Sequence, residues 1–92
     1  MLELREEIDR IDAALVALLS ERTTFIDRAA EIKRVVGLPA RIPARVEQVV
    51  TNVRQASGDG FDADMAEALW RELIEWSIRR EEMALAKKDA AE

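Results

Sequence analysis

Three basic residues are spaced so that they can grip one small anion: Arg22, Lys33 and Arg45. Lys33 follows Arg22 by eleven residues, so on one helix the two side chains point within about 20° of each other and lie about 16 Å apart along the axis. Two long side chains that lean toward each other leave a gap the size of a small organic acid. Arg45 follows a loop with two prolines and is able to close over that gap. The spacing therefore predicts an anion-binding site.

Arg22 also interrupts an apolar seam. Apolar residues recur at three- and four-residue spacing on both sides of it, as on one face of a long helix: Leu4, Ile8, Ile11, Leu15, Leu18, Phe25, Ala29, Ile32 and Val36. A guanidinium keeps its proton, and burying it without a partner is costly. Because the seam contains no carboxylate, a bound anion is a candidate partner; snorkelling to water or a salt bridge across a dimer is the alternative. Lys33 and Arg45, each taken alone, also suit solvated surface positions.

A serine and a carboxyl group lie four residues apart on a mostly apolar helix face. Ser77 and Glu81 share this face with Ile74, which suggests polar groups aimed at a ligand; the alternative is that both face water at the helix rim. Arg5 is about 25 Å from Arg22 along the first helix and about 100° off its face. Within one chain Arg5 cannot join the site, but an antiparallel partner can supply it.

The elements that must position these residues are three helices, long, short and long, which predict an all-α fold in a single domain of residues 1–92. They cover about residues 2–36, 44–56 and 62–86, and we expect the last half-dozen residues to be frayed. Gly37 and Pro39 end the first helix. Pro43 suits the first turn of the second helix, and Asp62 is a good N-cap for the third.

The first helix predicts a homodimer. Thirty-five helical residues span about 50 Å, whereas a compact globule of this size has a radius of gyration of about 12 Å. The helix must protrude with its apolar seam exposed, and a second copy packed along it covers that seam. The alternative is a monomer with a bent or broken first helix, but the helix contains no internal glycine or proline.

Composition narrows the chemistry. The chain has no cysteine and no histidine, which removes thiolate metal sites, the usual general base and the usual zinc ligand. We therefore expect no metal and no cofactor. Its net charge of −5 argues against nucleic-acid binding, and no apolar run approaches the roughly 20 residues of a membrane span. The charged N-terminus is unlike a secretion signal, so we expect a cytoplasmic protein.

The chain resembles the all-helical class of chorismate mutases over about residues 2–86. The stretches that carry the resemblance are Leu4-Arg5-Glu6-Glu7-Ile8-Asp9 with Ile11-Asp12, Leu18-Leu19-Ser20-Glu21-Arg22, Ala30-Glu31-Ile32-Lys33, Pro43-Ala44-Arg45 and Leu73-Ile74-Glu75-Trp76-Ser77. The spacing of Arg22, Lys33 and Arg45 agrees with that family. The resemblance implies an intertwined helical homodimer with two equivalent sites, each completed by an arginine from the partner's first helix.

The resemblance also implies roles for the polar residues. Arg22 and the partner's Arg5 hold the two carboxylates of the substrate, and Lys33 binds a carboxylate and the ether oxygen. Arg45 contacts the substrate from the loop, and Ser77 lies beside it. The implied reaction, chorismate to prephenate in aromatic amino-acid biosynthesis, is a pericyclic rearrangement that needs no nucleophile, base, metal or cofactor. It needs a compact substrate conformer and donors to the breaking ether bond.

Glu81 faces the ether oxygen by the same resemblance, at a position where many members carry glutamine. A glutamine amide always donates a hydrogen bond, whereas a carboxylate cannot and repels the developing negative charge. We therefore expect Glu81 to work in its protonated form. Activity then rises toward acid pH, and Glu81→Gln flattens the profile.

Two positions depart from the common mutase pattern. Val46 stands where many mutases have a glutamate that contacts a substrate hydroxyl, and Ile42 stands at an earlier loop position that is often aspartate. Both, with Trp76, are more like the isochorismate-pyruvate lyase branch, which forms salicylate and pyruvate on the same fold; aminodeoxychorismate mutases also lack that glutamate. The length of the loop before Arg45 favours the mutase. A non-catalytic dimeric helical module and a plain coiled coil are the remaining alternatives.

Overall fold

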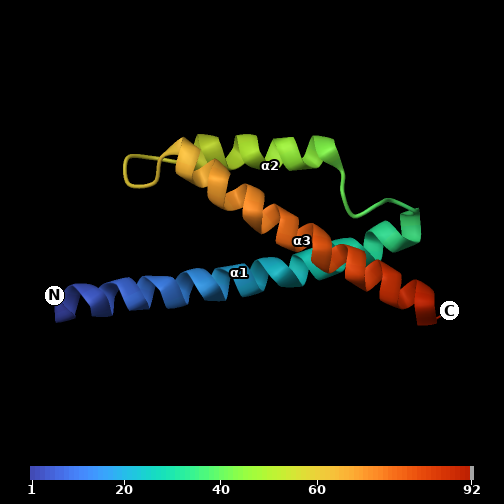
Figure 1. Ribbon diagram of the computed structural model, residues 1–92, viewed down its shortest axis with the longest axis horizontal. Helices are drawn as coiled ribbons and strands as arrows, with labels where there is room; N and C mark the ends of the chain where they lie inside the picture. The colour runs from blue at the N-terminus through green and yellow to red at the C-terminus, as the bar shows by residue number, and fades with distance from the viewer. Residues whose placement is uncertain (92) are drawn as a thin grey trace.

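Three α-helices make up the fold of the computed structural model, which describes residues 1–91 and the side chains of residues 1–87 (Figure 1). They are α1 (Leu2–Val36), α2 (Pro43–Ala56) and α3 (Ala63–Ala91). Within the described residues the only extended pairing is an isolated bridge between Gly58 and Phe61, at the turn that joins α2 to α3. The predicted all-α fold of long, short and long helices is confirmed.

The helix ends lie where local chemistry places them. Gly37 has φ 78°, the left-handed conformation of a C-terminal cap, and the N–H of Leu38 donates to the carbonyl of Lys33 at 2.9 Å. Pro43 occupies the first turn of α2 as predicted, and the helix begins at Pro43, one residue before the expected start at about Ala44. The Asp62 carboxylate accepts a hydrogen bond of 2.8 Å from the N–H of Met65, which confirms the predicted N-cap.

The predicted end of the third helix was wrong. The helix was expected to end near Ala86 with frayed residues after it, but α3 continues to Ala91. The segment 84–91 contains only alanine, leucine, lysine and aspartate, with no glycine or proline to stop a helix. Glu92, the last residue of the segment expected to fray, lies outside the described residues.

The helix α3 is the centre of the arrangement. It crosses the C-terminal half of α1, and its first half packs along α2 (Figure 1). In the described part of the chain, no Cα atom of α1 lies within 8 Å of one in α2. A small core of Ala40, Val50, Ile74 and Ile78 joins the loop, α2 and α3. The relation between α1 and α2 is therefore set through α3 and through the loop of residues 37–42.

The N-terminal half of α1 extends away from the other helices as a single unbroken helix (Figure 1). The molecule measures 55 × 26 × 15 Å with a radius of gyration of 16.2 Å, against about 12 Å for a compact chain of this length. Seam residues along this half are between 48% and 61% exposed: Leu4, Ile8, Ile11, Leu15 and Leu18. A single chain thus leaves a long apolar stripe uncovered, which is typical of an interaction surface.

None of the helices, over the described residues, is both long and apolar enough to cross a membrane.

Candidate functional site

A cavity of about 360 Å³ lies where α1, α2, α3 and the loop 37–42 meet. Five of its lining side chains carry charge or a hydroxyl group: Arg22, Lys33, Arg45, Ser77 and Glu81. The other lining residues are apolar: Phe25, Ile26, Ala29, Ala40, Ile42, Val46, Val49, Ile74 and Ile78. The volume suits a small organic molecule, and an apolar wall with a few convergent polar groups is typical of a ligand site.

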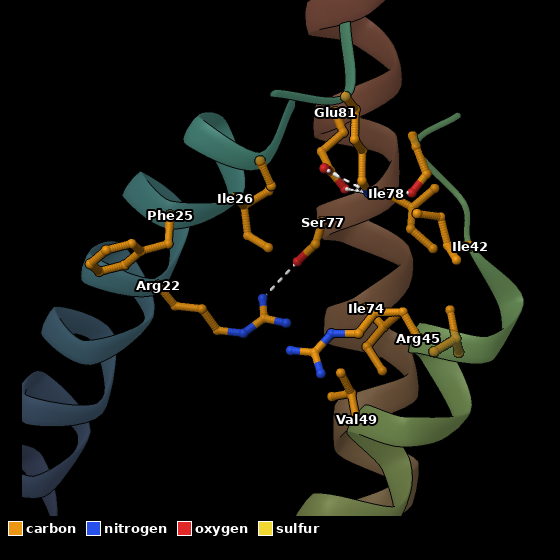
Figure 2. A pocket seen from close by; sticks show the side chains of 14 residues that line it. Arg22, Phe25, Ile26, Ile42, Arg45, Val49, Ile74, Ser77, Ile78 and Glu81 are labelled. Atoms are coloured by element: carbon orange, nitrogen blue, oxygen red, sulfur yellow. Dashed lines mark hydrogen bonds and ion pairs between the residues drawn. The ribbon is translucent and has the colours of Figure 1, made fainter. Parts of the chain in front are cut away.

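Arg22 reaches across from α1 toward α3. Its Nη1 donates a hydrogen bond of 2.7 Å to Ser77 Oγ, and that hydroxyl donates to the Leu73 carbonyl at 2.9 Å (Figure 2). Burial lowers the pKa of Arg22, and the neighbouring charge of Arg45 lowers it further, while Glu81 opposes both. Since Arg22 is held near a second cation, a ligand anion is favoured at this point.

Arg45 presents a second guanidinium on the α2 side of the cavity. Figure 2 shows it facing the guanidinium of Arg22 across the space between α1 and α2. Arg45 Nη1 donates to the side-chain oxygen of Gln48 at 2.8 Å. Among the described residues, neither Arg22 nor Arg45 forms an ion pair with a carboxylate. The two facing cations therefore have neutral hydrogen-bond partners and no internal counter-ion within salt-bridge distance.

Lys33 and Glu81 occupy the other end of the cavity. Lys33 Nζ donates to the Ala40 carbonyl at 2.7 Å and lies 3.0 Å from Glu81 Oε1 and 3.3 Å from Oε2. Glu81 is 4% exposed, and its Oε1 receives no well-aligned hydrogen bond despite the nearby ammonium. A buried oxygen without a directed partner is rare in proteins and suits a group that meets a ligand.

The apolar wall contains the two residues that departed from the mutase pattern. Ile42 precedes α2, Val46 lies in its first turns, and both line the cavity. Neither side chain can accept a hydrogen bond from a ligand hydroxyl. This wall therefore selects by shape and not by hydrogen bonding.

Arg5 lies outside the cavity of its own chain. It is exposed in the N-terminal half of α1, the part that extends away from α2 and α3 (Figure 1). The structure thus brings together seven of the eight residues singled out in the sequence. Arg5 is the one that lies apart, because on one helix it is about 25 Å from Arg22 and about 100° off its face.

Several parts of the site were not predicted. The Ala40 carbonyl that receives Lys33 is a backbone group with no signal in the sequence. Ile26 lies one turn after Arg22, and Ile78 lies three residues before Glu81. Helical spacing from the charged residues would have found these apolar residues, because positions three and four apart share a face.

Comparison with known families agrees with this geometry. The profile of the family described as chorismate mutase type II matches residues 4–82. The chain belongs to the chorismate mutase type II family. The resemblance drawn from the sequence is thereby confirmed, and the matched segment contains every residue that lines the cavity.

Relatives of this chorismate mutase type II chain differ in function and in length. It is 34% identical over 76 residues to the bifunctional chorismate mutase/prephenate dehydratase of Aquifex aeolicus, which covers 78% of this chain but 21% of that protein. It is 32% identical over 79 residues to the isochorismate pyruvate lyase of Pseudomonas aeruginosa, covering 83% of this chain and 75% of the lyase. The chorismate mutase of Methanocaldococcus jannaschii is 30% identical over 74 residues, covering 79% and 75%.

Proposed function

We propose that this protein is a chorismate mutase, which converts chorismate to prephenate by holding the substrate and not by covalent catalysis. The observation that carries the proposal is the pair of facing cations, Arg22 and Arg45, without an internal counter-ion in a cavity of about 360 Å³. Chorismate is a dicarboxylate, so its charges complement this end of the site. Membership of the family and two relatives with chorismate mutase in their names support the assignment.

The residues present match what a pericyclic rearrangement requires. The carbon–oxygen ether bond breaks while a new carbon–carbon bond forms, and no proton leaves the substrate. Arg22 and Arg45 fix the carboxylates, which keeps the substrate in a compact reactive conformer. Lys33 donates to the ether oxygen as negative charge grows there. Ile74 and Ile78 supply an apolar floor that excludes water and strengthens these interactions.

Glu81 acts in this proposal as the second donor to the ether oxygen, in its protonated form. In the ligand-free site it is the counter-ion of Lys33, at 3.0 Å. When a substrate with two negative charges binds, it replaces Glu81 as the counter-ion, because Lys33 then pairs with the ligand. The poorly partnered Oε1 of Glu81 is the atom placed to meet the ether oxygen.

A second copy of the chain completes the site in this proposal. The exposed seam of α1 is covered by the partner's α1 in an antiparallel homodimer, and the partner's Arg5 is brought to the cavity as a further cation. The uncovered seam and the distance of Arg5 from its own cavity support this arrangement. A cytoplasmic location stays a prediction from the sequence.

One observation favours a second candidate, isochorismate-pyruvate lyase. The cavity wall near α2 carries Ile42 and Val46, which offer no acceptor to a substrate hydroxyl. A relative named isochorismate pyruvate lyase is 32% identical, and this chain covers 75% of it. In that reaction the enolpyruvyl group leaves as pyruvate and the ring becomes salicylate.

The deciding experiment incubates the purified protein with chorismate and, separately, with isochorismate. Prephenate formed from chorismate, with a larger kcat/KM than salicylate formed from isochorismate, supports the mutase. The opposite ratio supports the lyase. Turnover of neither substrate at any practical protein concentration contradicts both and leaves a non-catalytic helical module.

A further inference from the structure

A two-pronged ion pair fastens the loop between α1 and α2 to α3. Arg41 Nη1 donates to Glu75 Oε1 at 2.8 Å, and Arg41 Nη2 donates to Glu75 Oε2 at 2.7 Å. The hydrogen bonds from Arg41 lower the pKa of Glu75, so this carboxylate stays ionised at neutral pH. Bidentate geometry of this kind fixes orientation as well as distance, which a single contact does not.

The residues on either side of Arg41 belong to the site. Ala40 is buried, and its carbonyl receives the ammonium of Lys33 at 2.7 Å. Ile42 lines the cavity, and its carbonyl receives the N–H groups of Arg45 and Val46 at 2.9 and 3.1 Å, which start α2. A shift of Arg41 therefore moves a partner of Lys33 and the base of the helix that carries Arg45.

Few other contacts fix the position of α2 relative to the cavity wall formed by α1. The backbones of the two helices stay apart over the described residues, and the six-residue loop 37–42 is their direct connection. Leu38 is 48% exposed and Ala40 only 6%, so apolar packing anchors this loop chiefly at Ala40. The Arg41–Glu75 pair is the second anchor.

We propose that Arg41 and Glu75 are positioning residues for the site: their ion pair fastens the loop to α3 and thereby sets the Ala40 carbonyl against Lys33 and presents Ile42 and Arg45 to the ligand. Neither side chain lines the cavity, so both act through other residues. The catalytic part of this inference rests on the proposed function, whereas the placement of the loop does not.

The chain offers a matched control in Arg71 and Glu47. This pair joins α2 to α3 with two hydrogen bonds, at 3.1 and 3.2 Å, and Arg71 also pairs with Glu67 at 2.7 Å. The side chains of Arg71 and Glu47 are 44% and 64% exposed, against 48% and 39% for Arg41 and Glu75. Neither control residue lines the cavity or belongs to the loop. Because exposed ion pairs contribute little to stability, either pair can be broken without unfolding the chain.

The kinetic test compares Arg41→Ala, Glu75→Ala, the double variant and Arg71→Ala with the unmodified full chain. Displacing groups that hold the substrate lowers kcat/KM by about tenfold in each single variant, mostly through KM. The double variant is no worse than either single one, since both changes remove the same pair. Arg71→Ala stays within about twofold of the unmodified protein. Additive losses, or an equal loss in Arg71→Ala, overturn the proposal.

Amide hydrogen exchange tests the loop without any turnover. The informative amides are those hydrogen-bonded across or next to the loop: Leu38, Arg45 and Val46. They are expected to exchange about tenfold faster in Arg41→Ala than in the unmodified chain, and at the unmodified rate in Arg71→Ala. Unchanged exchange overturns the proposal whatever the kinetics. Faster exchange in a protein that turns over neither substrate upholds the positioning role and refutes the proposed function alone. If Arg41→Ala or Glu75→Ala fails to fold by circular dichroism, Glu75→Gln, which keeps the side-chain size, takes its place in removing the charge of this pair.

Discussion

At the scale of single residues, Arg22 is a partly buried cation that lacks a carboxylate partner. Its only side-chain partner among the described residues is the Ser77 hydroxyl, a neutral group, although Arg45 faces it. Two cations near each other with neutral partners are stabilised by a bound anion and not by the fold. The proposed function therefore assigns Arg22 to substrate binding, and its loss is expected to cost the helical structure little.

Arg22→Ala is therefore expected to lower kcat/KM for chorismate by at least about 10²–10³, as for the loss of one charge-stabilising donor, with helical content unchanged. Arg28→Ala is the matched control, because Arg28 is an exposed arginine of the same helix whose partner is Glu31. Steady-state kinetics and circular dichroism check both variants. Turnover that survives Arg22→Ala would place the site elsewhere.

Glu81 gives the account its pH dependence. If Glu81 donates a hydrogen bond as the protonated acid, kcat/KM rises as the pH falls, and in Glu81→Gln, whose amide donates at every pH, the profile is flat. Steady-state kinetics across the pH range measure both profiles. A flat profile in the unmodified protein contradicts this role.

At the scale of the elements, the end of α1 sets where the loop begins. Gly37 has φ 78°, and a methyl group added there meets nothing within 4 Å, so the cost of Gly37→Ala is backbone strain alone. We expect the free energy of unfolding to fall by about 1 kcal/mol. Gly60→Ala, which is equally open but lacks the positive φ, should change it by less than about 0.5 kcal/mol. Urea denaturation distinguishes the two; equal effects would argue against the cap.

The ion pair between Asp27 in α1 and Arg80 in α3 predicts that the stability of the fold decreases in acid. The hydrogen bonds from Arg80 in α3 lower the pKa of Asp27 in α1. Because the folded-state pKa is the lower one, the pair stabilises the fold above the unfolded value of about 4 and is lost as the pH falls through the folded value. As the pH is lowered below about 4, the free energy of unfolding should decrease, and this decrease should be smaller in Arg80→Gln than in the unmodified protein. Urea titrations at one protein concentration measure this, and identical losses in both proteins would contradict it.

Much of the element layout could be predicted from sequence, because its determinants are local. Helical periodicity and the stop and start residues Gly37, Pro43 and Asp62 located α1, α2 and the start of α3, and the 100° step placed Lys33 on the face of Arg22. The far end of α3 was missed because no residue marks it. The loop contacts were missed for another reason: where a backbone carbonyl such as that of Ala40 points depends on the path of the whole loop.

At the scale of the whole molecule, the proposed homodimer accounts for the apolar stripe that one chain leaves uncovered. The stripe from Leu4 to Leu18 is about half exposed, and burying it against a second copy stabilises both chains by the hydrophobic effect. In the same arrangement the partner's Arg5 reaches a cavity that the chain's own Arg5 cannot. In the proposed dimer, dimer formation and completion of the site are one event, and neither cavity is expected to work without the other chain.

Subunit mixing tests this claim most directly. Arg5→Ala and Arg22→Ala variants are each expected to be inactive dimers, because every site in either homodimer lacks one arginine. When the two are unfolded and refolded together in equal amounts, half of the dimers are mixed and each mixed dimer has one intact site, so about a quarter of the activity of the unmodified protein returns. No recovery in refolded mixtures that are dimeric by sedimentation, while the unmodified protein converts chorismate, would contradict a site shared between two chains.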